Sequence, residues 1–276
     1  MGIEEEVARH YGNAGIAARV LAALREAQGP DAPITVDGLA PLDQFHGRGP
    51  VATRELVLLL APQPGERLID IGSGIGGPAR WIAAKCGCHV TGVDLTAEFC
   101  EAAEALNLAT ELTDRVRIIQ GSALALPVPD GAFDAGYSQN VVMNIADKAL
   151  FYREAFRALR PGGRLALSNY CAGTVGDPHY PVAWAMTADT SFLATPEEMR
   201  ADLIAAGFDI ADFRDTTEAI REAQRRNLAR LEQGERPRVA ADIILGERAR
   251  EMQINSLRNA QEGRIRPVEA LARKPG

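Results

Sequence analysis

The spacing of apolar residues along this chain changes repeatedly between the two periods that distinguish strands from helices. Helical spacing fills the segments 76–86, 96–110 and 146–160, which lie between short apolar runs. Strands that alternate with helices form parallel βαβ units with right-handed crossovers. We therefore predict an α/β fold with a doubly wound, mostly parallel sheet. Its seven strands are expected at 67–71, 89–94, 116–120, 133–139, 164–170, 209–215 and 265–273.

Helical patterns also occupy two segments outside this alternation. Residues 1–30 repeat apolar side chains every three or four positions, and another helix is expected after a loop over 31–50. Residues 217–262 are rich in Ala, Arg, Glu and Leu, which favours helices. We predict an N-terminal helical arm over 1–60 and a sheet domain over 61–276. The helical insertion before the last strand is expected to join the arm as a lid over whatever the sheet binds.

Turn residues and prolines mark several boundaries. Pro161, followed by two glycines, separates a helix that ends at Leu159 from the next strand. Thr195 begins a later helix as its N-cap, and Glu198 completes a capping box. Pro267 has no amide hydrogen to donate. It therefore either confines the last strand to an edge of the sheet or belongs to that strand's first residues.

Composition and charge narrow the functional classes. The chain has 276 residues, 46% of them hydrophobic, which is enough for a sizeable core. The net charge of −7 offers no broad positive surface to nucleic acid or to an anionic membrane. No apolar stretch spans a bilayer and the acidic start lacks the features of a signal peptide, so we expect a soluble, cytoplasmic protein. Cys86, Cys88, Cys100 and Cys171 lack zinc-ligand spacing, so buried free thiols and no metal site are expected.

The strongest chemical signal is the run LIDIGSGIGG, where a strand carrying Asp70 leads directly into a glycine-rich turn and a helix. Glycines let the backbone turn sharply and approach a ligand, and the helix N-terminus presents free amide donors. Asp94 ends the second strand, twenty-two residues after Gly72, at the distance where a carboxylate accepts hydrogen bonds from a ribose diol. Together these features predict a cofactor of the adenosine type.

The position of the acid distinguishes among such cofactors. A dinucleotide fingerprint reads G-x-G-x-x-G, whereas this chain reads D-x-G-x-G-x-G. A carboxylate beside the loop repels a pyrophosphate but suits an ammonium or a sulfonium, which disfavours an NAD-linked oxidoreductase. This motif, the pair Asp94-Leu95 and the segments 121–135 and 159–168 resemble the class I S-adenosylmethionine-dependent methyltransferases. That resemblance implies their Rossmann-like fold and S-adenosylmethionine as the cofactor.

A narrower resemblance links the chain to the sarcosine and dimethylglycine N-methyltransferase group, through LDQFHGRG at 42–49, MNIADK at 143–148 and PHYPVAWA at 178–185. It implies that Asp70 and the glycine loop hold the methionine end of the cofactor, that Asp94 binds the ribose and that Leu95 packs on the adenine. Family members usually carry Gly-Asp-Ala after the third strand, where this chain has Gly121-Ser122-Ala123. The cofactor-binding residues expected are Tyr11, Gln44, Asp70, Gly72, Ser73, Gly74, Gly76, Asp94, Leu95, Ser122, Ala123, Gln139 and Asn140.

The methyl acceptor should be held by polar groups at the carboxyl ends of the strands, where doubly wound sheets bind ligands. Methyl transfer from a sulfonium is an in-line displacement, so positioning outweighs acid-base chemistry, although an ammonium acceptor must first lose a proton. We expect His46, Tyr170 and Asn144 to act as catalytic residues, with a loop-stabilising hydrogen bond as the alternative for His46. Asn169 is also expected near the acceptor. The cluster His179, Tyr180 and Trp184 either walls the acceptor pocket or serves plain packing, and His10 is expected to face solvent.

These features predict an enzyme that transfers a methyl group to a small molecule, most simply an amine nitrogen of the sarcosine or dimethylglycine kind. Arg48 is the nearby cation that would pair with an acceptor carboxylate, or with the carboxylate of the cofactor. The alternatives are carbon or oxygen methylation of a specialised metabolite, an NAD-linked oxidoreductase and a non-catalytic protein that binds S-adenosylmethionine. No nucleic-acid or membrane partner is expected, and a homodimer stays open.

Overall fold

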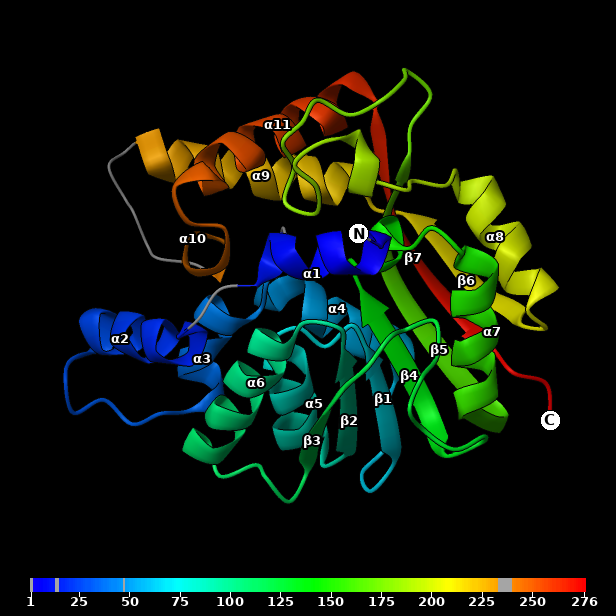
Figure 1. Ribbon diagram of the computed structural model, residues 1–276, viewed down its shortest axis with the longest axis horizontal. Coiled ribbons are helices and arrows are strands. Elements are labelled where there is room, and N and C mark those ends of the chain that lie inside the picture. The colour runs from blue at the N-terminus through cyan, green and yellow to red at the C-terminus, as the bar shows by residue number, and fades with distance from the viewer. Residues whose placement is uncertain (1, 13–14, 47, 233–239) are drawn as a thin grey trace.

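The computed structural model describes residues 2–12, 15–46, 48–232 and 240–276. Its centre is a seven-stranded sheet in the order β3-β2-β1-β4-β5-β7-β6 (Figure 1). The first five strands run parallel, and β7 is antiparallel to both of its neighbours. The predicted α/β fold with a mostly parallel, doubly wound sheet is therefore confirmed. The strands are β1 (Arg67–Ile71), β2 (His89–Asp94), β3 (Val116–Gln120), β4 (Phe133–Gln139), β5 (Leu159–Ala172), β6 (Asp209–Asp215) and β7 (Ile265–Arg273).

Two hydrophobic cores lie on the two faces of the sheet, because neighbouring residues of a strand point to opposite sides. Leu68 of β1 packs with α4 (Pro50–Leu60), α5 (Gly77–Cys86) and α6 (Ala97–Ala109). The next residue, Ile69, packs with α7 (Lys148–Ala158) and α8 (Pro196–Ala205). The helices between the strands thus cover both faces, as the crossover rule requires.

The last strand lies inside the sheet, between β5 and β6, so an edge position for it is wrong. The other alternative holds, because Pro267 is the third residue of β7 and its carbonyl accepts from the amide of Thr216, just beyond the end of β6. The pairing with β6 begins only at Val268. The missing amide hydrogen of Pro267 therefore removes no hydrogen bond from the ladder with β6.

The predicted boundaries are accurate where local chemistry sets them. The Thr195 hydroxyl accepts from the amide of Glu198 (3.1 Å), whose carboxylate accepts in return from the Thr195 amide (2.7 Å), so the capping box is confirmed. The α7 helix ends at Ala158, one residue before the predicted end, but β5 begins at Leu159 and contains Pro161 and the two glycines, so the prediction that they separate the helix from the strand is wrong. All four cysteines are free, and Cys86 alone among them is only partly buried.

The arm contains three helices before α4: α1 (Ile3–Tyr11), α2 (Ile16–Gln28) and α3 (Val36–Asp43). The third corrects the prediction of a loop over 31–50. The insertion is helical as expected, with α9 (Thr217–Glu232), α10 (Ala240–Leu245) and α11 (Ala249–Glu262). Short 3-10 turns are η1 (Val142–Asn144), η2 (Ala188–Thr190) and η3 (Gly246–Arg248). No helix in the described part of the chain is both long and apolar enough to cross a membrane.

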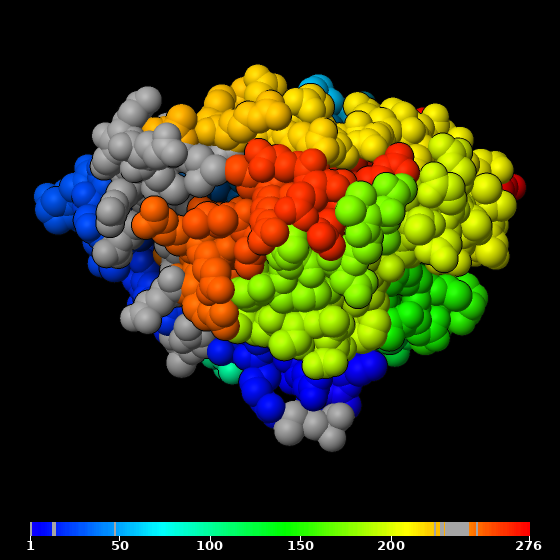
Figure 2. All heavy atoms as spheres, turned by 90° about the horizontal axis from the view of Figure 1, so that it is seen from above, coloured from blue at the N-terminus to red at the C-terminus, as the bar shows by residue number. Residues whose placement is uncertain are grey.

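Helices from both ends of the sequence meet above the carboxyl edge of the sheet. In Figure 1, α9 and α11 lie side by side, and α1 runs between them and the strand ends. In the view from above, α11 and the chain that precedes α8 extend across the top of the molecule, with α1 at their edge (Figure 2). This arrangement encloses the space at the strand ends.

Candidate active site

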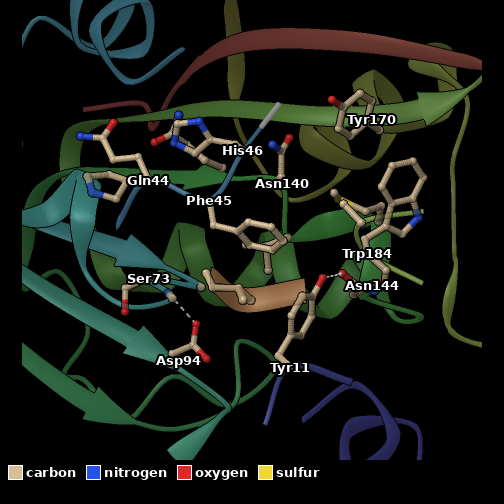
Figure 3. A pocket seen from close by; sticks show the side chains of 18 of the residues that line it. Tyr11, Gln44, Phe45, His46, Ser73, Asp94, Asn140, Asn144, Tyr170 and Trp184 are labelled. Atoms are coloured by element: carbon tan, nitrogen blue, oxygen red, sulfur yellow. Dashed lines mark hydrogen bonds between the residues drawn. The ribbon is translucent and has the colours of Figure 1, made fainter. Parts of the chain in front are cut away.

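A cavity of about 750 Å³ lies at the carboxyl ends of the parallel strands. Its wall combines the glycine-rich turn after β1, the ends of β2, β3 and β4, helix α1 of the arm and helices α9 and α11 of the insertion. Figure 3 shows this cavity from close by. It lies where a doubly wound sheet binds its ligands, and segments distant in sequence meet there.

The glycine-rich turn is tied to the second strand. The Gly74 amide donates to Oδ2 of Asp94 (2.7 Å), and the Thr96 amide donates to Oδ1 of the same carboxylate (2.9 Å). Gly72 has a φ of 81°, and a Cβ there would lie 2.3 Å from Val141 Cγ2, so only glycine fits. Asp94 therefore supports the turn and caps the start of α6 in addition to facing the cavity.

The glycine-rich turn is also stabilised by a buried arginine that the sequence analysis did not identify. Arg80 is completely buried, and its guanidinium donates to Oδ2 of Asp43 (2.9 Å) and to the carbonyl of Ile75 (2.7 Å). The end of α3 approaches so closely that a Cβ on Gly77 would lie 2.2 Å from the Asp43 carbonyl oxygen. The signal in the sequence is an arginine within an otherwise apolar helical segment directly after the glycines.

Several buried polar atoms in the cavity wall have no hydrogen-bond partner in the described part of the chain. Buried polar groups in native proteins are nearly always hydrogen-bonded, so a cluster of exceptions indicates a polar ligand. These atoms fit a group with an ammonium and a carboxylate, such as the methionine end of the predicted cofactor. They are Oδ1 of Asp43, both amide atoms of Gln44, Nδ1 of His46, Oδ2 of Asp70, Oγ of Ser73 and Nε2 of Gln139.

Burial changes the protonation of two of these groups. Desolvation raises the pKa of Asp70 to about 8; a side-chain hydrogen bond with Tyr137 acts against this shift, and the nearby Asp94 carboxylate acts with it. Desolvation lowers the pKa of His46 to about 4, and the positive charge of Arg48 lowers it further. Near neutral pH the free protein therefore carries a protonated Asp70 carboxyl and an uncharged His46 imidazole.

His46 lies in a network with a threonine that the sequence analysis did not single out. The Thr53 hydroxyl donates to Oε1 of Gln139 (3.4 Å), and its oxygen lies 3.2 Å from Nε2 of His46. With the Thr53 hydrogen directed to Gln139, the tautomer that completes the network carries its hydrogen on Nε2 and has Nδ1 as an acceptor. Both alternatives weighed for His46 are thus present, a loop-stabilising hydrogen bond and a place in the cavity wall.

On the opposite side of the cavity, Tyr11 points toward Asn144 (Figure 3). The Tyr11 hydroxyl donates to Oδ1 of Asn144 (3.3 Å), whose amide nitrogen donates to the carbonyls of Trp184 (2.7 Å) and Thr190 (3.0 Å). The Asn144 side chain is therefore fully engaged with the protein. Its position ties helix α1 to the segment around residue 184.

Aromatic and aliphatic side chains form another part of the cavity wall. Tyr170 stacks on Trp184 with ring centroids 5.0 Å apart, and burial raises the pKa of Tyr170 to about 12, so its hydroxyl stays protonated. Met143 and Met252 complete this wall from η1 and α11. The Trp184 indole donates to the Ser191 hydroxyl (3.0 Å), which fixes the ring.

Arg48 is not available as a free cation. Its guanidinium donates to Glu269 (2.8 Å) and also pairs with Glu55. The Arg48 and Glu269 side chains are both nearly completely buried. A carboxylate from an acceptor would have to compete with the two that are already in place.

The cavity wall contains the predicted His46, Tyr170 and Asn144 and most of the predicted cofactor residues. Gly76 and Ser122 are not part of it; Gly76 lies against Arg80, and the Ser122 hydroxyl donates to Glu4. Asn169 binds the backbone of Met143 and Tyr170 and stays outside the cavity wall.

Histidines elsewhere serve packing. His179 pairs with Glu262 (2.8 Å), away from the cavity. Nε2 of His10 bonds to the carbonyl of Ala183 (3.2 Å), so the expectation that His10 faces solvent is wrong. The described residues contain no group of three or more His, Cys, Asp or Glu that would hold a metal ion.

Comparison with known proteins adds three findings. Residues 69–167 match a family model described as a methyltransferase domain. The chain is 30% identical over 203 residues to a phosphoethanolamine N-methyltransferase of Triticum aestivum, an alignment that covers 71% of this chain but only 40% of that relative.

Two solved structures show the same fold. A geranyl diphosphate C-methyltransferase from Streptomyces coelicolor, in complex with S-adenosyl-L-homocysteine, superposes with a TM-score of 0.72 at 19% identity, over 99% of this chain and 98% of the other. A putative sarcosine dimethylglycine methyltransferase from Galdieria sulphuraria gives a TM-score of 0.64 at 17% identity, over 92% and 98% of the two chains.

Proposed function

We propose that this chain, which carries a methyltransferase domain on the class I methyltransferase fold, transfers a methyl group from S-adenosylmethionine to a small-molecule acceptor. The observation that carries the proposal is the set of unpartnered polar atoms beside the Asp94-supported glycine turn, inside one enclosed cavity. Cavity walls from α1, α9 and α11 favour an acceptor small enough to be surrounded. The match to a methyltransferase family, together with the acid before the glycines, disfavours an NAD-linked oxidoreductase.

Residues at different strand ends would contact different parts of the cofactor. Asp94 would accept hydrogen bonds from the ribose hydroxyls, and Leu95 and Ala123 would pack against the adenine. Asp70, Ser73 and Gln44 would hold the methionine end, where their unpartnered atoms lie. When bound, S-adenosylmethionine supplies an electrophilic methyl group on a sulfonium, which transfers in line with the departing thioether.

The chain's own contribution to the transfer is the positioning of an uncharged nucleophile. Nδ1 of His46 would accept a hydrogen bond from the nucleophile, because Nε2 lies against Thr53 and the imidazole is uncharged near neutral pH. The protonated Tyr170 hydroxyl would donate to the acceptor. Asn144 acts as a positioning residue through Tyr11, because its own amide is fully used.

An amine nitrogen stays the first candidate for the nucleophile, because uncharged donors and acceptors suit an amine that must arrive without its proton. Glycine derivatives are disfavoured within this class, since the Arg48 charge is neutralised by two carboxylates. The apolar wall of Met143, Trp184 and Met252 supports a second candidate, carbon or oxygen methylation of a larger apolar metabolite.

The test uses labelled S-adenosylmethionine with a mixed library of amines, amino acids, phenols and isoprenoids. We expect label on an organic acceptor, and loss of that label in His46→Ala with S-adenosylhomocysteine affinity retained. Label only on carbon or oxygen would remove the amine assignment and leave methyl transfer in place. Failure of the wild-type protein to bind S-adenosylhomocysteine would refute the proposed function as a whole.

A further inference from the structure

One face of helix α1 forms part of the cavity wall. Ile3, Glu4, Val7 and Tyr11 all line the cavity, at the spacing that places side chains on one side of a helix. The other two acids of the first turn, Glu5 and Glu6, do not line it. Glu4 is thus the acidic side chain that α1 directs to the cavity.

A hydrogen bond fixes the Glu4 carboxylate at the end of β3. The Ser122 hydroxyl donates to Oε1 of Glu4 and accepts from the Leu124 amide (3.0 Å). The single hydrogen of Ser122 is therefore committed to the carboxylate. Gly121, Ala123 and Leu124 line the cavity beside this point, and Leu95 and Phe99 line it from the next strand end and from α6.

This end of the cavity suits a flat heterocycle with one polar edge. Leu95, Phe99 and Val7 offer apolar contact surfaces, and Glu4 offers a carboxylate at their margin. A purine that bears an exocyclic amine presents an N–H donor at its edge. A carboxylate accepts from such a donor in a charge-assisted hydrogen bond, which is stronger than one between neutral groups.

We propose that Glu4 accepts a hydrogen bond from the exocyclic amine of the adenine, so that a carboxylate from the N-terminal helix recognises the base while Ser122 holds that carboxylate in place. The inference rests on the proposed function, because it assumes an adenosine cofactor with its ribose at Asp94. It also gives α1 a double role. The same helix carries Tyr11, which reaches Asn144 on the acceptor side (3.3 Å), so binding of the base steadies an element that also borders the acceptor.

A purely structural role for Glu4 is the competing explanation. Acidic side chains in the first turn of a helix interact favourably with its dipole, and Glu4, Glu5 and Glu6 all occupy that turn of α1. Glu5 already accepts from the Gly2 amide (3.1 Å). Glu6 shares the dipole interaction but not the cavity, which makes Glu6→Ala the matched control.

The experiment compares the dissociation constants of S-adenosylhomocysteine and of its analogue with unsubstituted purine, which lacks the 6-amino group, by titration calorimetry. We expect the wild-type chain and Glu6→Ala to prefer the amine-bearing ligand by about tenfold to twentyfold, which is the lower end of the range for a hydrogen bond to a charged group. In Glu4→Ala the two constants should become nearly equal. A loss of affinity for both ligands alike would indicate helix packing instead.

A second variant tests whether the carboxylate itself, and not the packing of helix α1, causes the preference for the amine-bearing ligand. Ser122→Asp in the Glu4→Ala background returns an acid to the end of β3 and should restore the preference. If the preference is absent from the wild type, unchanged in Glu4→Ala, or not restored by Ser122→Asp, the proposal is wrong. Those results would leave the proposed function standing as long as the wild-type chain binds S-adenosylhomocysteine.

Discussion

Binding of the cofactor should release a proton from Asp70. Burial raises the pKa of this carboxyl to about 8, so at pH 7 about 0.9 of the molecules carry it protonated. An ammonium placed within about 4–6 Å of a carboxylate lowers its pKa by roughly one to three units. If the ammonium of the ligand lies beside Asp70 and the drop is two to three units, between about 0.8 and 0.9 proton leaves the protein at pH 7.

The release can be measured by titrating S-adenosylhomocysteine into the protein at pH 7 in buffers with different ionisation enthalpies. The slope of the observed binding enthalpy against the buffer enthalpy gives the number of protons released. Affinity should rise with pH between 6 and 7, because deprotonation of a group with a pKa one unit above the solution pH costs about 1.4 kcal/mol. His46 should add nothing at these pH values, since its pKa of about 4 keeps it uncharged with or without the ligand.

Two variants assign the proton. Asp70→Asn removes the titrating group and should remove most of the buffer dependence, and any part that remains belongs to Asp94, whose pKa burial also raises. Asp134→Asn removes a carboxyl that pairs with Arg160 outside the cavity and should leave the release unchanged. A binding enthalpy that is the same in all buffers would show that Asp70 is already ionised or does not meet the ammonium, and either result would refute the reasoning.

Three further predictions address the ribose, the support of the turn and the lid. Asp94→Ala should weaken S-adenosylhomocysteine binding by about 1.5–3 kcal/mol for each ribose hydrogen bond lost, and unchanged affinity in a folded variant would move the ribose elsewhere. Arg80→Ala should lower the free energy of unfolding in urea by about 3–5 kcal/mol, because Asp43 stays buried without its cation. The control Arg160→Ala breaks an exposed ion pair and should cost under about 1 kcal/mol, so equal losses would contradict the assignment. Addition of cofactor and acceptor together should slow amide hydrogen exchange in α1, α9 and α11. Unchanged exchange in these helices would refute the prediction that they act as a lid.

The features that the sequence predicts well are those encoded by neighbouring residues. The turn after β1 is encoded by glycines at alternate positions within a few residues, and Asp94 follows at the end of the next strand, so both their structure and their shared location are local properties. The capping box at Thr195 is local in the same sense. Each is confirmed because the interactions that stabilise it span only a few residues or one βαβ unit.

The features that the sequence does not predict depend on contacts between residues far apart in the chain. Helix α3 contains Gly38 and Pro41, both poor helix formers, and it is stabilised by the pair between Asp43 and Arg80 of α5. The antiparallel position of β7 between β5 and β6 is a property of the sheet and leaves no mark on the strand's own sequence. His10 reaches a carbonyl 173 residues away, so its burial could not be read from the first helix.

Contacts with distant residues also decide which polar residues are available to a ligand and which already use their hydrogen-bonding groups within the protein. Residue type and position placed Arg48, Asn144 and Asp70 together near the strand ends, but the number of protein partners decides what each can do. Arg48 pairs with two carboxylates and Asn144 makes three hydrogen bonds, whereas the Asp70 carboxyl interacts with the Tyr137 hydroxyl and its Oδ2 makes no close hydrogen bond in the described part of the chain. The unsatisfied atoms cluster at the end of β1, and the acceptor wall is aromatic and aliphatic. Of the unpartnered atoms, those of Gln44, Asp70 and Ser73 would serve the cofactor, whereas Nδ1 of His46 would serve the acceptor, whose remaining contacts would come from the apolar wall.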